Sequence, residues 1–183
     1  MKKIFLLLIL FPIVAYCDVW NKEESSYINS KYHIMWLLPK HLEWEQQKND
    51  DAMFKANCGY MYSVAIRVVP GDDSLKPNTV WNIKEYLRKS VEDGLKIYEK
   101  RNPYTVKIPP VSAKNIMFRD LKTVRLYFQI SISLGDENTM KTHAVQYIFP
   151  YRGNVLYLEL MTNDNSVNCN LIFDELLKGV TLL

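Results

Sequence analysis

The sequence has few of the residues around which enzyme and cofactor sites are usually built. Among its 183 residues are six glycines, three cysteines and three histidines. The glycines stand singly at turn-like positions, so there is no glycine-rich loop before a helix to cradle a phosphate group. None of the common nucleotide, metal-protease, nucleophile-elbow or redox motifs occurs. We therefore expect no catalytic residue, no cofactor and no metal site.

The histidines and the acidic pairs give no indication of a metal centre. His33, His41 and His143 lack the i, i+4 spacing that places two ligands on one helix face, and a metal needs three or four converging donors. The pairs Asp72-Asp73 and Asp136-Glu137 lie in loop-like segments. We interpret them as solvated turn residues, with weak calcium binding as the alternative.

The chain also lacks a strong excess of charge and a second long apolar run. The formal net charge of +3 includes Lys2 and Lys3, so the remainder is close to neutral. A dedicated nucleic-acid-binding protein would show a clear basic patch, and nucleic acid is therefore not an expected partner. After the first seventeen residues, no apolar stretch is long enough to predict a transmembrane helix.

The first seventeen residues have the layout of a secretory signal peptide. A basic start is followed by an apolar run over 4–14 and by Ala15-Tyr16-Cys17, and the run is too short to span a bilayer stably. We predict export to the periplasm or the medium, with two alternative endings. Either a peptidase cuts after Cys17, or Cys17 is acylated and the product is a membrane-anchored lipoprotein. Contact with a membrane is expected only in the second case.

Two cysteines remain in the exported chain. An even number of cysteines in an oxidising compartment favours a disulfide between Cys58 and Cys169. Such a bond would stabilise the fold by about 4 kcal/mol in the chain-entropy model. Two separate buried thiols are the alternative, because pairing requires the two Cα atoms to lie within about 7 Å.

The hydrophobic pattern predicts a flexible lead-in over 18–30 and a single α+β domain over 31–183. We expect one antiparallel sheet and two main helices, because runs of strands are separated by a single helix and followed by a second. Period-two alternation is clearest over 123–134, and an apolar stripe at helical spacing marks the helix over 81–100. The other predicted strands span 32–39, 42–46, 53–56, 60–69, 143–149 and 155–161, and a terminal helix ends at Gly179 in the C′ position.

Polar residues on the predicted sheet suggest a binding surface. The chain has twelve tyrosines and four tryptophans, and aromatic faces both fill cores and bind partners. Along 123–134 one set of alternating residues is polar, which indicates a solvated sheet face. A partner-binding patch is predicted from Arg67, Arg125, Tyr127 and Gln129 if they align across neighbouring strands.

The order of segments resembles a known family. The run KYHIMWLLPKHLEWE is similar to the opening strand, proline, tryptophan and strand of PsbP-like domains, a family that includes DcrB and the Ran-binding Mog-type proteins. The run AIRVVPGDDSL resembles their strand and loop before the first helix, and the likeness extends over 27–183. It implies an α/β/α layout with a central antiparallel sheet. It implies no single function, because the family places unrelated roles on one scaffold.

These observations lead to one expected function and two alternatives. We expect an exported, non-enzymatic accessory or binding protein of the bacterial cell envelope, which contacts a protein or another envelope component. The alternatives are a small-ligand or lipid carrier and a hydrolase without a recognisable local motif.

Overall fold

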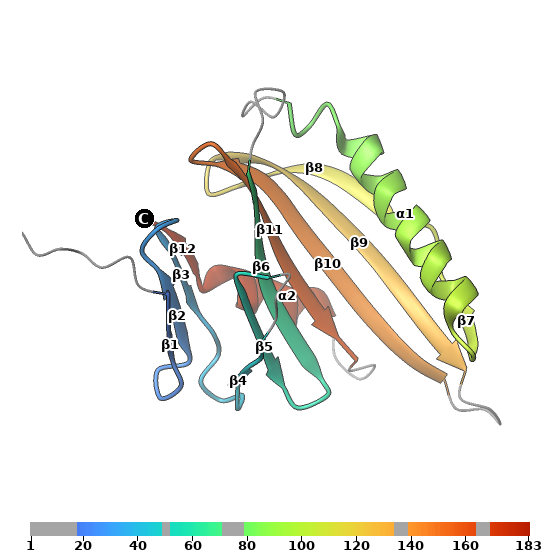
Figure 1. Cartoon of the computed structure of the whole chain (residues 1–183), viewed down its shortest axis with the longest axis horizontal. Helices are drawn as coiled ribbons and strands as arrows, with labels where there is room; N and C mark the ends of the chain where they lie inside the picture. The colour runs from blue at the N-terminus through green and yellow to red at the C-terminus, as the bar shows by residue number, and fades with distance from the viewer. Residues whose placement is uncertain (1–17, 49–51, 71–78, 134–138, 164–168) are drawn as a thin grey trace, which may run out of the picture.

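The chain folds into two antiparallel sheets and two helices, which confirms the α+β prediction (Figure 1). The computed structural model describes residues 18–48, 52–70, 79–133, 139–163 and 169–183. The predicted signal peptide, residues 1–17, lies outside the described part.

The larger sheet has eight strands, three of which form a meander at the strands predicted over 123–134, 143–149 and 155–161. The meander consists of β9 (Leu121–Ser133), β10 (Thr139–Tyr151) and β11 (Asn154–Thr162). Beyond β11 the order continues through β6 (Tyr62–Pro70), β5 (Phe54–Cys58) and β4 (Glu45–Gln46). On the other side, β9 pairs with both β7 (Thr105–Lys107) and β8 (Ser112–Phe118).

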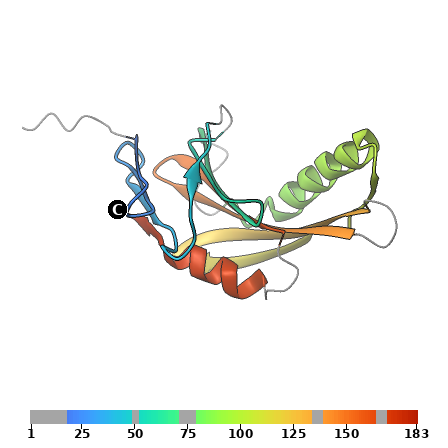
Figure 2. The same ribbon diagram turned by 90° about the horizontal axis from the view of Figure 1, so that it is seen from below.

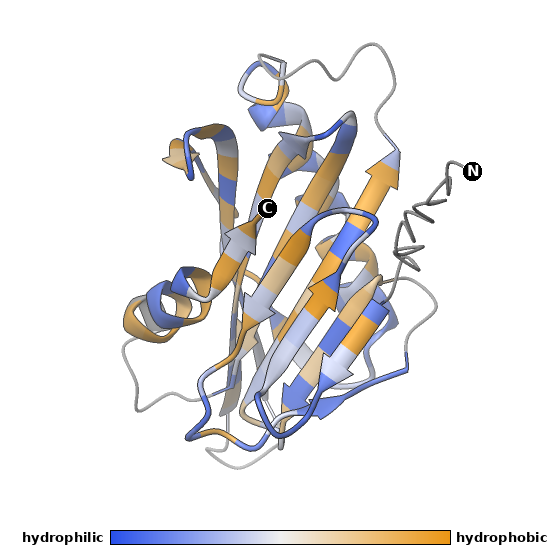
Figure 3. Cartoon of the chain, turned by 90° about the vertical axis from the view of Figure 1, so that its left-hand side faces the viewer, coloured by the Kyte–Doolittle hydropathy of each residue, from blue (hydrophilic) through white to orange (hydrophobic). Residues whose placement is uncertain are grey.

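A second sheet replaces the flexible lead-in that was predicted over 18–30. Its order is β1 (Asp18–Asn21), β2 (Ser26–Asn29), β3 (Ile34–Leu37) and β12 (Val180–Leu182). The lead-in prediction was wrong because Tyr27 is fully buried and stacks on Phe54 of the larger sheet at a centroid distance of 4.1 Å. Figure 3 looks onto this smaller sheet and shows hydrophobic and hydrophilic residues in bands along its strands.

The two helices lie on opposite faces of the larger sheet (Figure 2). Helix α1 (Lys84–Arg101) packs on one face, in a core that includes Leu87, Val124 and Leu126. Helix α2 (Cys169–Lys178) and the smaller sheet pack on the other face, around Trp36 and Phe173. Among the described residues, neither helix is long and apolar enough to cross a membrane.

Helix α1 begins later than its apolar stripe predicts. Its first residue is Lys84, and no side chain caps it. The preceding residues form tight turns, in which the backbone carbonyl of Thr79 accepts hydrogen bonds from the N–H groups of Asn82 (2.9 Å) and Ile83 (3.1 Å). The indole of Trp81 donates to the carbonyl of Thr123 at 3.1 Å and so fixes this segment to β9.

The segment after Pro39 also differs from its predicted arrangement. Trp44 is buried, and its indole donates to the carbonyl of Pro39 at 3.1 Å. The strand predicted over 42–46 is reduced to β4, which pairs with β5 in the larger sheet and not with β3. Residues 38–44 therefore carry the chain from one sheet to the other.

Gly179 lies between α2 and β12, but for a different reason from the one predicted. A C′ glycine adopts a left-handed backbone, and among the described glycines Gly59 and Gly153 have a positive φ whereas Gly179 does not. The requirement at Gly179 is space: a Cβ atom there would lie 1.8 Å from the carbonyl oxygen of Leu37. The Gly179 carbonyl accepts a hydrogen bond from the Leu37 N–H at 2.9 Å, so the two backbones touch directly.

Candidate functional site

The predicted patch is divided between the two faces of the larger sheet. Arg67 pairs with Tyr157 across β6 and β11, and the same row continues through Ile148 to Val124 on β9. Val124 belongs to the core under α1, so Arg67 lies on the α1 face. Because side chains alternate along a strand, the other three predicted residues lie together on the opposite face. These three are Arg125, Tyr127 and Gln129.

Strand pairing extends these three residues into a larger polar surface, which we call the β9 strip. Lys107 of β7 and Lys141 of β10 both lie opposite Ser131, and Lys114 of β8 lies opposite Arg125. Between these two rows, Ser112 pairs with Tyr127, and His143 pairs with Gln129. The β9 strip consists of Lys107, Ser112, Lys114, Arg125, Tyr127, Gln129, Ser131, Lys141 and His143.

Hydrogen bonds order the middle of the β9 strip. Tyr127 Oη and His143 Nδ1 share a hydrogen bond of 2.7 Å, and the two rings stack. Gln129 Nε2 donates to Ser131 Oγ at 3.0 Å. Partial burial, reinforced by the charge of Lys141, holds the pKa of His143 below its usual value, so this imidazole is neutral near pH 7. The centre of the strip is therefore polar but uncharged.

The ends of the β9 strip are cationic. Strands β7, β8, β9 and β10 contain five lysine and arginine residues and no aspartate or glutamate. Lys107, Lys114 and Lys141 are exposed, and none of them forms an ion pair within the part of the chain that the structure describes. Figure 2 shows that the sheet extends well beyond α2 on this side. The strip thus presents positive charge on a face that is covered only in part, since Val145 and Tyr147 beside it belong to the core under α2.

The opposite face carries a half-buried ion cluster where α1 does not cover the sheet. Arg67 Nη2 lies 3.3 Å from Glu159 Oε2, and Gln146 Nε2 donates to Glu159 Oε1 at 3.1 Å. Lys55 lies in the same cross-strand row, separated from Glu159 only by the small side chain of Ala65. Burial nevertheless raises the pKa of Glu159 above its usual range, although Arg67, Gln146 and Lys55 oppose that rise.

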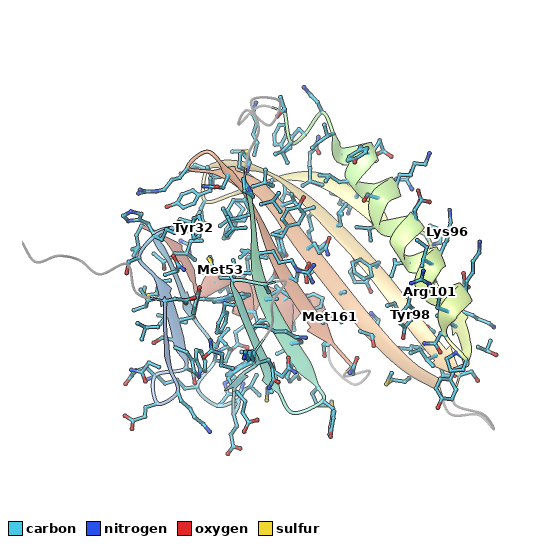
Figure 4. All side chains as sticks on the ribbon, in the orientation of Figure 1. Tyr32, Met53, Lys96, Tyr98, Arg101 and Met161 are labelled. Atoms are coloured by element: carbon cyan, nitrogen blue, oxygen red, sulfur yellow. The ribbon has the colours of Figure 1, made fainter. Side chains whose placement is uncertain are left out.

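A pocket of about 260 Å³ adjoins this cluster at the β5–β6 turn. Its walls include Lys55, Asn57, Ser63 and Met161, and Figure 4 places Met161 on the part of the sheet away from α1. The side-chain oxygen of Asn57 is buried there without a hydrogen-bond partner. An unsatisfied buried acceptor is costly, so this oxygen lowers the stability of the pocket wall.

The remaining predicted sites are not assembled into a reactive centre. Among the described residues, no group of three or more histidine, cysteine, aspartate or glutamate side chains is placed to hold a metal ion. Cys58 is a free thiol whose pKa is raised by burial, and the side chain of Cys169 lies outside the described part, so the structure gives no support to the predicted disulfide. Cys17 also lies outside it.

Comparison with known proteins identifies the fold. The solution structure of cyanobacterial PsbP (CyanoP) from Synechocystis sp. PCC 6803 aligns with a TM-score of 0.58 at 13% identity, covering 94% of this chain and 99% of that chain. The chain has a PsbP/Mog1-like fold. The Ran-binding protein Mog1p from Saccharomyces cerevisiae aligns with a TM-score of 0.50 at 6% identity, covering 88% of this chain and 96% of that chain.

A third similar structure comes from Bacteroides thetaiotaomicron VPI-5482, with a TM-score of 0.51 at 8% identity; the alignment covers 88% of this chain and 49% of that chain. No protein-family model matches the sequence, and no curated protein matches it. The PsbP/Mog1-like identity therefore concerns the fold alone.

Within this PsbP/Mog1-like domain, sequence reasoning missed the lysines of the β9 strip and the Glu159 cluster. One signal for the lysines was available: over residues 102–133 the only acidic residue is Asp120, which lies in a turn. No local signal pointed to Glu159, because its partners Arg67 and Gln146 come from β6 and β10.

Proposed function

We propose that this PsbP/Mog1-like domain is an exported, non-enzymatic accessory protein of the bacterial cell envelope that binds a partner through the β9 strip. The observation that carries the proposal is the strip itself, a partly covered sheet face with exposed lysines at both ends and an ordered, half-buried polar centre. Among the similar folds, Mog1p is a Ran-binding protein, so the scaffold has a precedent for binding another protein.

Export is proposed from the first seventeen residues, and it is tested by the mass of the protein recovered from the cell envelope. Expression of the full chain is expected to give a product that begins at Asp18 or one that carries a diacyl or triacyl adduct on Cys17. Full-length protein confined to the cytosol would refute export.

Binding through the β9 strip is tested by photo-crosslinking in the same cells. A photoreactive residue at Gln129 is expected to form a discrete adduct, whereas the same residue at Tyr86, which is exposed on α1, is not. Equal labelling from both positions, or none from Gln129, would contradict the assignment of the strip.

A small-ligand role is the second candidate, and the pocket beside Asn57 favours it. A polar ligand that binds in this pocket should raise the melting temperature of the wild-type protein. The same ligand should leave the melting temperature of N57L unchanged, because leucine fills similar space without the amide's hydrogen-bonding atoms. A ligand that shifts both proteins equally binds elsewhere.

A further inference from the structure

Cations lie in two groups on the β9 strip, and their spacing indicates what kind of partner fits. Lys107 and Lys141 flank Ser131 at one end, and Lys114 lies beside Arg125 at the other. Arg125 and Ser131 are six positions apart on β9, a distance of about 20 Å in an extended strand. The two flanking lysines lie two strand spacings apart, about 10 Å. The strip is therefore narrow and about six extended residues long.

The residues between the two groups provide hydrogen-bonding side chains. They are a serine, a tyrosine, a glutamine and a neutral histidine, and the aliphatic residue in the same rows, Val145, is fully buried. Insertion into a bilayer interface would favour exposed apolar side chains next to the lysines. A peptide backbone instead offers carbonyl groups that hydroxyl and amide donors can bind.

We propose that the β9 strip binds an extended acidic segment of a protein partner, with carboxylates at its two ends and a neutral centre. This rests on the proposed function, because it names the partner chemistry of the same surface. Charge complementarity supplies the attraction and the recognition of spacing. The two cationic groups bind the acidic ends of the segment, and the polar side chains around Gln129 bind the backbone between those ends.

The test uses two fluorescent peptides of identical composition. In the matched peptide, Glu-Glu-Ser-Ser-Ser-Ser-Glu-Glu, the acidic pairs are six positions apart; in the control, the four glutamates are contiguous. At low salt we expect the matched peptide to bind the mature chain about threefold more tightly, because the control reaches only one cationic group at a time. Equal binding of both peptides would refute recognition of spacing.

Two charge-matched variants locate the binding surface. K107A/K114A/K141A should bind the matched peptide about tenfold more weakly, since it loses three exposed ion pairs. K89A/K96A/K100A removes the same charge from α1 and should bind as the wild type does. Both variants should have the melting temperature of the wild type, because the substituted lysines are exposed. Equal loss in both variants would mean non-specific attraction and would overturn the proposal.

Vesicles with anionic phospholipid provide the competing outcome. In this outcome the wild type binds such vesicles but not the matched peptide, and K107A/K114A/K141A abolishes that binding. It would overturn the proposal and show that the strip binds a lipid surface and not an acidic segment. That result would leave export and the Gln129 adduct unaffected. Conversely, peptide binding by a protein retained in the cytosol would refute the proposed location while the peptide specificity stood.

Discussion

Replacing Gly179 by alanine tests whether direct backbone contact joins α2 and β12 to β3. The new Cβ would lie 1.8 Å from the Leu37 carbonyl oxygen, whereas real Cβ atoms keep at least 3.0 Å from such a neighbour. One of the two backbones must therefore move by more than about 1 Å, since a carbonyl oxygen cannot rotate away as a flexible side chain does. That displacement also breaks the 2.9 Å hydrogen bond between Leu37 N–H and the Gly179 carbonyl.

The cost follows from these two effects. Overpacking of a dense region costs about 1–3 kcal/mol, and a lost backbone hydrogen bond costs about 0.5–1.5 kcal/mol. We expect G179A to lower the free energy of unfolding by about 2–4 kcal/mol, which corresponds to a fall of about 6–12 °C in melting temperature for a chain of this size.

Gly94 provides the matched control, because it lies inside α1 and a Cβ atom added there would have no neighbour within 4 Å. G94A should stabilise the protein by about 1 kcal/mol through helix propensity. Both variants are measured by differential scanning calorimetry and by denaturant titration. A G179A protein as stable as the wild type would refute the reasoning from close approach.

Three further substitutions test other parts of the fold. Asp120 has a φ of 63° in the two-residue turn between β8 and β9, so D120G should raise the free energy of unfolding from denaturant titration by about 0.5–1 kcal/mol; a lower value would contradict strain at this turn. Trp36 donates to the carbonyl of Leu176 at 2.8 Å inside the core, so W36F should cost about 2–4 kcal/mol by the same assay, and a neutral effect would be evidence against this bond. Because burial raises the pKa of Glu159, its contribution to stability is complete below the usual glutamate pKa and is lost as the pH rises through the raised value. The melting temperature of E159Q relative to wild type should therefore increase from about pH 4 to about pH 7, and a difference that is constant or falls over that range would show that burial is not the dominant effect.

Local patterns predicted the strands of the meander, because alternation is a property of each strand alone. The shared face of Arg125, Tyr127 and Gln129 follows from that alternation. Arg67 could not be assigned to a face in the same way. Its side depends on the register of β6 against β11, and a shift of one residue would reverse it.

Strands β1 and β2 of the smaller sheet were missed although they pair with neighbours in sequence, because contacts with distant residues hold them in place. Residues 18–29 show little regular pattern, and their order comes from Tyr27 packing on Phe54 and from β3 pairing with β12. Gly179 illustrates a related limit: its position after a helix suggested a cap, and only the tertiary contact with Leu37 reveals why glycine is needed.

The pairing of β12 with β3 also determines when this domain can be completed. Val180 lies opposite Trp36, so the sheet that holds β1 and β2 lacks one of its strands until the final residues of the described chain are available. A chain emerging from a ribosome or a translocation pore would hold its amino-terminal strands without that partner until synthesis or transport was nearly finished. Long-range closure of this kind slows folding and keeps the chain open for longer. A secretory pathway that threads unfolded chains through a membrane would benefit from that delay.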